Sequence, residues 1–129
     1  MRTATFLGAA MLGLWPGLAL ALDISDFNLV STEDLYRICS VAPNDPTCSQ
    51  ALAFCEGFVV GALSYHDAIS DRKHLQRFVC YPVGASRNEG IKAFVNWAAA
   101  NQKNQKFMNE PPIYGAIRGL ASKWPCKGS

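Results

Sequence analysis

Hydrophobic and small residues recur through residues 47–70 with the spacing of one broad helical face. The residues of this face are Leu52, Cys55, Phe58, Val59, Ala62, Leu63, Tyr65, His66 and Ile69. The spacing follows the period of an α-helix rather than the alternation of a strand. Pro46 suits the first position of such a helix, and a dense run of charge at 71–74 follows its expected end near Ser70. The pattern therefore predicts a long central helix around which the rest of the chain is organised.

Two glycines interrupt the central helix. Gly57 and Gly61 are four residues apart and so share one face. Each costs about 1 kcal/mol relative to alanine inside a helix. We expect the backbone of another helix, in the same subunit or in a second one, to pack against them and offset this cost. A Gly61→Leu substitution should then be destabilising by several kcal/mol through overpacking.

Three further helices are predicted, over about residues 32–41, 87–100 and 112–124. Ser31 can cap the first, and Ser86 with Glu89 forms the capping-box pattern before the second. A proline pair precedes the last. Residues 78–84 read as a short extended stretch, without a credible partner strand. The fold class predicted is all-α, a small bundle of four (or four to five) helices.

The first 21 residues have the organisation of a secretory signal peptide. Arg2 is followed by an uncharged stretch at 7–20, and Ala19-Leu20-Ala21 provides the small residues of a cleavage site. The stretch is shorter than the ~20 residues of a membrane span. We predict cleavage after Ala21, which leaves one domain over residues 22–129 that is exported to the periplasm.

Composition excludes several kinds of function. The 12 basic and 10 acidic residues nearly balance, which gives no indication of nucleic-acid binding or of an anionic membrane surface. The two histidines and the absence of a C-x-x-C pair argue against a metal site. His66 and Asp67 are adjacent on the central helix, so we expect their side chains to diverge and His66 to be a hydrogen-bonded core residue. No catalytic residue, cofactor or metal site is predicted, and the protein is not expected to be an enzyme.

Five cysteines in an exported domain indicate two disulfides and one spare thiol. Consecutive helices with short links pack antiparallel, which favours the pairs Cys39–Cys55 and Cys80–Cys126. Loops of these sizes are credited with about 3 and about 4 kcal/mol in the chain-entropy model. Cys55–Cys80 remains the main alternative pairing. Cys48 has no obvious mate, and three fates stay open: a buried thiol, exchange with Cys55, or a bridge between two chains.

The candidate partner-binding residues lie in two charged loops. One follows the central helix, and the other precedes the last helix and includes Met108 in the same corner. The candidates are Asp71, Arg72, Lys73, Lys103, Lys106 and Phe107. Mixed charge beside apolar side chains is typical of a protein-binding surface.

Four short motifs resemble the Rap/Tai family of periplasmic immunity proteins of type VI secretion systems. In order, they are Leu-Tyr-Arg-Ile-Cys at 35–39, Cys-Glu-Gly-Phe-Val-Val-Gly at 55–61, Phe-Val-Cys-Tyr-Pro at 78–82 and Trp-Pro-Cys at 124–126. Together they span nearly all of the mature chain. Cys48 and the segment 101–104, which lacks the His-Pro of many members, depart from the pattern.

The resemblance implies an all-helical, disulfide-bonded and often dimeric protein without enzymatic activity. Such a protein occupies the active-site cleft of a peptidoglycan amidase effector and protects its producer. The alternatives are a small periplasmic stress chaperone, a family member with a role other than immunity, and a redox protein that uses Cys48. Client protection at low pH would indicate the chaperone, and a reactive thiol with turnover would indicate the redox protein.

Overall fold

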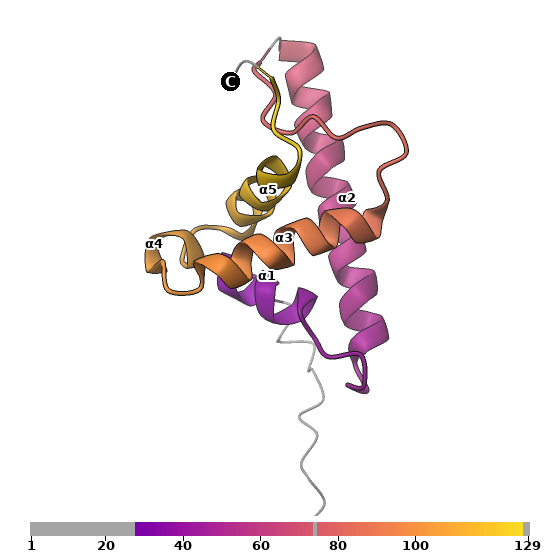
Figure 1. Ribbon diagram of the computed structural model, residues 1–129, viewed down its shortest axis with the longest axis vertical. Helices are drawn as coiled ribbons and strands as arrows, with labels where there is room; N and C mark the ends of the chain where they lie inside the picture. The colour runs from indigo at the N-terminus through magenta and orange to yellow at the C-terminus, as the bar shows by residue number, and fades with distance from the viewer. Residues whose placement is uncertain (1–27, 74, 128–129) are drawn as a thin grey trace, which may run out of the picture.

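Five helices make up the part of the chain that the computed structural model describes, residues 28–73 and 75–127 (Figure 1). They are α1 (Thr32–Cys39), α2 (Cys48–Lys73), α3 (Arg87–Asn101), α4 (Gln105–Met108) and α5 (Pro112–Lys123). Within those two ranges there is no strand, and a single antiparallel bridge joins Val79 to Pro125. The all-α prediction is confirmed. The predicted signal peptide, residues 1–21, lies outside the described residues.

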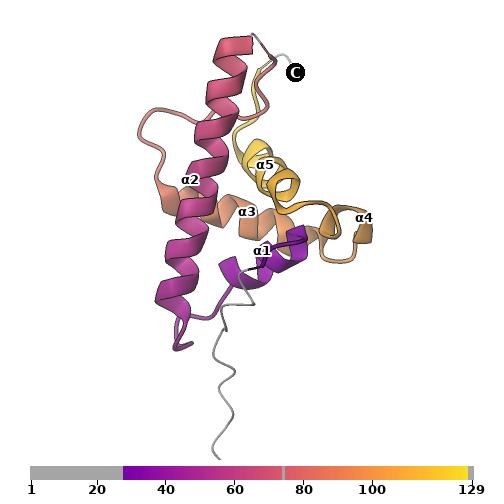
Figure 2. The same cartoon turned by 180° about the vertical axis from the view of Figure 1, so that it is seen from behind.

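The helices form a layer of three packed against one long helix. In both views α1 and α5 lie on the same side of α2, α3 crosses α2, and α2 runs along most of the height of the molecule (Figures 1 and 2). The core lies where the four meet. Its fully buried side chains include Leu35 of α1, Val59 of α2, Phe94 of α3 and Leu120 of α5. The long helix extends beyond the core, and the neighbours of its upper half include α5 and the 75–81 segment.

Capping residues define where α1 and α3 begin. At Ser31 the side chain accepts the Asp34 N–H (3.2 Å), and the Asp34 carboxylate accepts the Ser31 N–H (2.9 Å). The Ser86 and Glu89 pair makes the same reciprocal contacts, at 3.2 and 2.8 Å. Each capping box satisfies amide groups that would otherwise lack partners at a helix start. Both starts fall at the predicted residues.

The buried stripe of α2 is narrower than the sequence pattern indicates. It consists of Ala51, Cys55, Val59, Ala62, His66 and Ser70. Leu52 and Tyr65, which were expected on the buried face, are 42% and 66% exposed. The expectation was wrong for these two because α2 packs against neighbours on one side only. The helix also continues past Ser70 to Lys73.

The glycines of α2 do not make the close packing that we expected within the chain. Gly57 and Gly61 are exposed, and a Cβ at either would meet nothing within 4 Å. The close approaches occur in α5 instead. A Cβ at Gly119 would stand 2.7 Å from the Phe94 Cα, and one at Gly115 would overlap Thr32. The α5 helix therefore packs its backbone directly against α3 and the start of α1.

Two disulfides join the helices in the favoured pairing. Cys39–Cys55 connects the end of α1 to α2, with a Cα–Cα distance of 5.6 Å. Cys80–Cys126 connects the segment after α2 to the chain after α5, at 4.9 Å. Beside it the Cys80 N–H donates to the Trp124 carbonyl (2.9 Å). Cys48 is a free, half-buried thiol in the first turn of α2.

Candidate functional site

An apolar groove of about 500 Å³ lies between the upper half of α2 and α5. Its lining is formed by Ala62, Tyr65, His66, Ile69, Phe78, Ile113, Tyr114, Ile117, Arg118 and Ala121. Phe78 and Tyr114 are 59% and 58% exposed, so large aromatic side chains stand open to solvent here. Its volume exceeds that of a second hollow, described below.

The groove exists because α5 is apolar on two faces. Gly115, Ala116, Gly119 and Leu120 are buried against α1 and α3. Ile113, together with Tyr114, lies on the side turned towards α2, where the helices are too far apart to cover it. Ile113 has the spacing of one helical face with Ala116, Ile117 and Leu120, which predicts a buried side chain, yet it lines the groove. Apolar residues on both faces of one short helix were the signal that could have revealed it.

His66 joins α2 to the segment that follows it. The Phe78 backbone N–H donates to His66 Nε2 (3.1 Å), which must therefore be unprotonated. Nδ1 carries the proton and faces Asp67 Oδ1 at 3.1 Å. The side chain is 6% exposed. The prediction of a hydrogen-bonded core histidine is confirmed, whereas the expected divergence from Asp67 was wrong, because the carboxylate rotates back towards the ring.

Asp67 is the centre of a charged network on the groove's edge. It accepts from the Tyr81 hydroxyl (2.6 Å) and lies 3.4 Å from the Arg77 guanidinium, which also contacts Asp71 (2.8 Å). Burial raises the pKa of Asp67, but the hydrogen bonds from Tyr81 and His66 and the charge of Arg77 outweigh it and lower the pKa overall. The hydrogen bond to Asp67 raises the pKa of Tyr81 in turn. This network holds the segment after α2 against the helix.

The network contains residue types that act in catalytic sites, but its histidine has no unoccupied ring nitrogen. Both ring nitrogens of His66 have partners, so neither is free to take a proton from a substrate.

Over the described ranges, no group of three or more histidine, cysteine, aspartate or glutamate residues is placed to hold a metal ion. Nor does any helix there have the length and hydropathy of a bilayer span.

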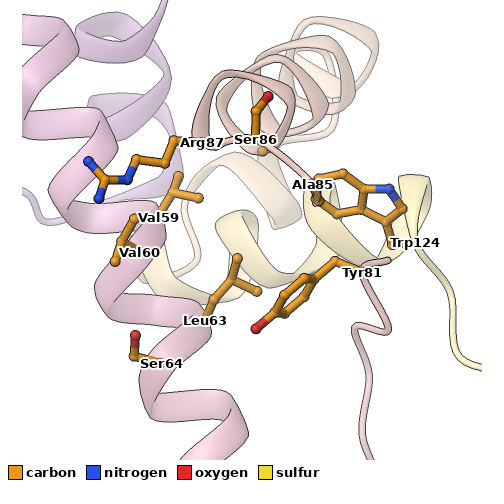
Figure 3. A pocket seen from close by; sticks show the side chains of 10 residues that line it. Val59, Val60, Leu63, Ser64, Tyr81, Ala85, Ser86, Arg87 and Trp124 are labelled. Carbon is orange, nitrogen blue, oxygen red and sulfur yellow. The ribbon is translucent and has the colours of Figure 1, made fainter. Parts of the chain in front are cut away.

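A smaller hollow, about 170 Å³, lies on another side of α2 (Figure 3). Val60 and Leu63 line it from α2, while Tyr81 and Trp124 line it from the disulfide-bonded region. The two aromatic rings lie 6.4 Å apart at a tilt of 60°. Figure 3 shows the Tyr81 ring reaching towards Leu63 and the Arg87 side chain at the opposite end. Its lining mixes hydroxyls and one arginine with apolar side chains, and its size suits one or two side chains.

The predicted partner-binding residues fall in two separate regions. Asp71, together with Arg72, is exposed at the end of α2, where its contact with Arg77 brings it next to the groove. Lys73 closes the same helix. Lys103 and Lys106 are exposed near α4, which both views place at the other side of the molecule (Figures 1 and 2).

The apolar residues of the second region are structural. Phe107 is half-buried, with its ring 5.9 Å from that of Trp97 and beneath the Arg118 guanidinium at 4.7 Å. Met108, expected in an exposed corner, is buried in the core. The reason is α4, a four-residue helix that turns these side chains inward and is too short to leave a periodic pattern in the sequence.

A family model described as Rap1a immunity proteins matches residues 31–126. The chain belongs to the Rap1a immunity protein family. The match begins at the capping serine of α1 and ends at the last cysteine of the second disulfide, so it includes all five helices. The resemblance seen in the sequence motifs is thereby confirmed. No curated protein and no solved structure was found to match the chain.

Proposed function

We propose that this Rap1a-family protein is a periplasmic immunity protein that binds a type VI effector and blocks its active site without catalysis. The observation that carries the proposal is the family match across the whole helical domain. Two further features support it. The chain begins with the pattern of an export signal, and the cysteines are placed for the disulfides of an oxidising compartment.

The groove between α2 and α5 is the surface that we propose for contact with the effector. Tyr65, Phe78 and Tyr114 offer rigid aromatic area that is more than half exposed, and such residues contribute most to protein interfaces. Asp71 and Arg72 at the neighbouring helix end provide a polar rim. A peptidoglycan amidase is the effector class that the sequence motifs imply, since related immunity proteins fit into amidase clefts.

An inhibition assay tests the proposal directly. The mature, disulfide-bonded domain is mixed with the hydrolase encoded beside it, and release of peptide from peptidoglycan is measured. We expect inhibition at one immunity protein per enzyme. Tyr114→Ser should weaken binding about tenfold or more, as the loss of a central aromatic contact does. Lys103→Ser, at the other side of the molecule, is the matched control and should bind normally.

The possible results test the immunity function and the choice of the groove as contact surface separately. Full hydrolase activity in the presence of excess protein would contradict the immunity function. If Lys103→Ser weakens the inhibition and Tyr114→Ser leaves it unchanged, the immunity function is supported and the contact surface is the α3–α4 region instead of the groove. Suppression of client aggregation at low pH, without any effect on the hydrolase, would favour the chaperone alternative.

A further inference from the structure

A single hydrogen bond from the backbone connects the middle of the 75–81 segment to α2. On one side, the Leu75 N–H donates to the Ser70 carbonyl (3.1 Å). On the other side, Val79 is fully buried and bridged to Pro125, and Cys80 is held by its disulfide. Between these anchors, residues 76–78 are attached by the Phe78 N–H bond to His66 Nε2 and by the ion pairs of Arg77.

We propose that residues 76–78 form a pH-sensitive latch on the groove, closed while His66 is neutral and released when its imidazole is protonated. The neutral ring accepts the Phe78 N–H at Nε2. A protonated ring carries N–H groups at both nitrogens and can accept nothing. The Phe78 N–H and the new Nε2–H would then be two donors facing each other, so the bond that closes the latch cannot exist in that state.

The second attachment weakens for a related reason. His66 Nδ1 and Arg77 Nη1 both approach the same oxygen, Asp67 Oδ1, at 3.1 and 3.4 Å. A positive imidazolium keeps Asp67 as its partner and repels the guanidinium that shares this oxygen. In that state the imidazolium and the guanidinium compete for one carboxylate oxygen, which loosens the Arg77 contact with Asp67. Protonation therefore opposes the Phe78 bond and the Arg77–Asp67 contact at once, whereas the Arg77–Asp71 contact (2.8 Å) does not involve His66.

Other charged and titratable groups around His66 do not replace the lost bond. The charged and titratable residues that line the groove with His66 or belong to the Asp67 network are Tyr65, Asp67, Asp71, Arg77, Tyr81, Tyr114 and Arg118. Arg118 is already paired with Glu110 (2.9 and 3.0 Å), and the Tyr81 hydroxyl donates to Asp67. Because Phe78 and His66 both line the groove, release of the latch removes one aromatic wall of it.

Two measurements on the intact, disulfide-bonded chain test the proposal. Amide hydrogen exchange reports whether the Phe78 N–H bond is formed, and histidine ¹⁵N chemical shifts report whether His66 is protonated. The comparison is made at about pH 7.5 and about pH 5, which bracket the range where histidine charge changes. After correction for the intrinsic exchange rate, we expect protection of the Phe78 amide to fall about tenfold or more as His66 becomes protonated. The nearby Cys80 amide, bonded to Trp124, is the internal control and should stay protected.

Variants test the role of the ring. His66→Gln can still accept the Phe78 N–H through its side-chain oxygen but does not titrate, so its Phe78 protection should not depend on pH. His74→Gln removes the other histidine and should keep the transition. The proposal is overturned if Phe78 stays protected while His66 is protonated, if His66 stays neutral throughout, or if Cys80 loses protection in parallel. Should His66→Gln fail to fold, the wild-type shifts and exchange decide alone.

Discussion

Two glycines let the backbone of α5 come close to its neighbours. At Gly119 there is no room for a Cβ beside Phe94, and at Gly115 none beside Thr32. Gly57 and Gly61 have the same spacing in α2 but stand open to solvent. Identical spacing in two helices therefore has opposite consequences, because the α5 glycines lie on its buried face and the α2 glycines lie on its exposed face.

Paired alanine substitutions should show this difference. Gly119→Ala forces a methyl group against the Phe94 backbone and should destabilise by about 1–3 kcal/mol. Gly61→Ala adds helix propensity at an open site and should stabilise by about 0.5–1 kcal/mol. Urea unfolding with both disulfides intact measures the two. Equal effects of the same sign would show that α5 does not pack as described.

The acidic side chains predict how stability responds to acid. Hydrogen bonds from Tyr81 and His66 and the charge of Arg77 lower the pKa of Asp67 despite its burial, and the bonds to Ser31 and Arg37 lower that of Asp34 in the same way. A carboxyl group with a lowered pKa stabilises the fold above its unfolded value, about 3.9, and this contribution is lost as pH falls through the folded value.

We therefore expect thermal stability to drop steeply from about pH 5 downwards. Asp67→Asn removes the charge and leaves one acceptor oxygen where the carboxylate has two, so the drop should be shallower in this variant, and its stability near neutral pH should be lower. Melting temperatures measured across the acid range provide the comparison. Parallel pH profiles for the two proteins would contradict this role of Asp67.

At the scale of elements, the two disulfides differ in their surroundings. Cys39–Cys55 lies in the core between α1 and α2, where both residues are buried. Cys80–Cys126 lies at the surface, with Cys80 exposed. The first reinforces the packing of two helices, whereas the second holds the segment after α2 against the end of α5 and so shapes one end of the groove.

Mild reduction under native conditions should open the two bridges in sequence. A reductant reaches the exposed Cys80 directly, while attack on the buried pair needs the helices to separate. Alkylation followed by peptide mass spectrometry should label Cys80 and Cys126 before Cys39 and Cys55. Simultaneous labelling of all four, with Cys48 already labelled in the oxidised protein, would indicate global unfolding instead of a local opening.

At the scale of the whole molecule, the helices leave two kinds of surface on α2. One surface, on the upper half of α2, faces α5 across the groove. The other is the exposed face of α2 that carries Gly57 and Gly61. The homodimer implied by the family resemblance stays a prediction, and the exposed face with Gly57 and Gly61 is where it would pack closely. Sedimentation should then show a dimer that Gly61→Arg converts to a monomer, with the helical content unchanged. A wild-type protein that is monomeric at all concentrations would contradict the homodimer.

The sequence by itself determined the class of the fold and the starts of α1 and α3, and it favoured the disulfide pairing that the structure has. These depend on neighbours close along the chain, such as the Ser86 and Glu89 cap, or on the short links that bring Cys39 to Cys55. Its motifs also identified the family before the structure was considered.

Only the tertiary structure decided which apolar residues are covered. Tyr65 and Ile113 fit a buried pattern, yet they line an open groove because α2 and α5 diverge. The hydrogen bond between His66 and Phe78 could also not be predicted from local pattern, because the two residues are 12 apart along the chain. Periodicity reports the face on which a side chain lies. Whether another element covers that face depends on contacts distant in sequence, which no local pattern records.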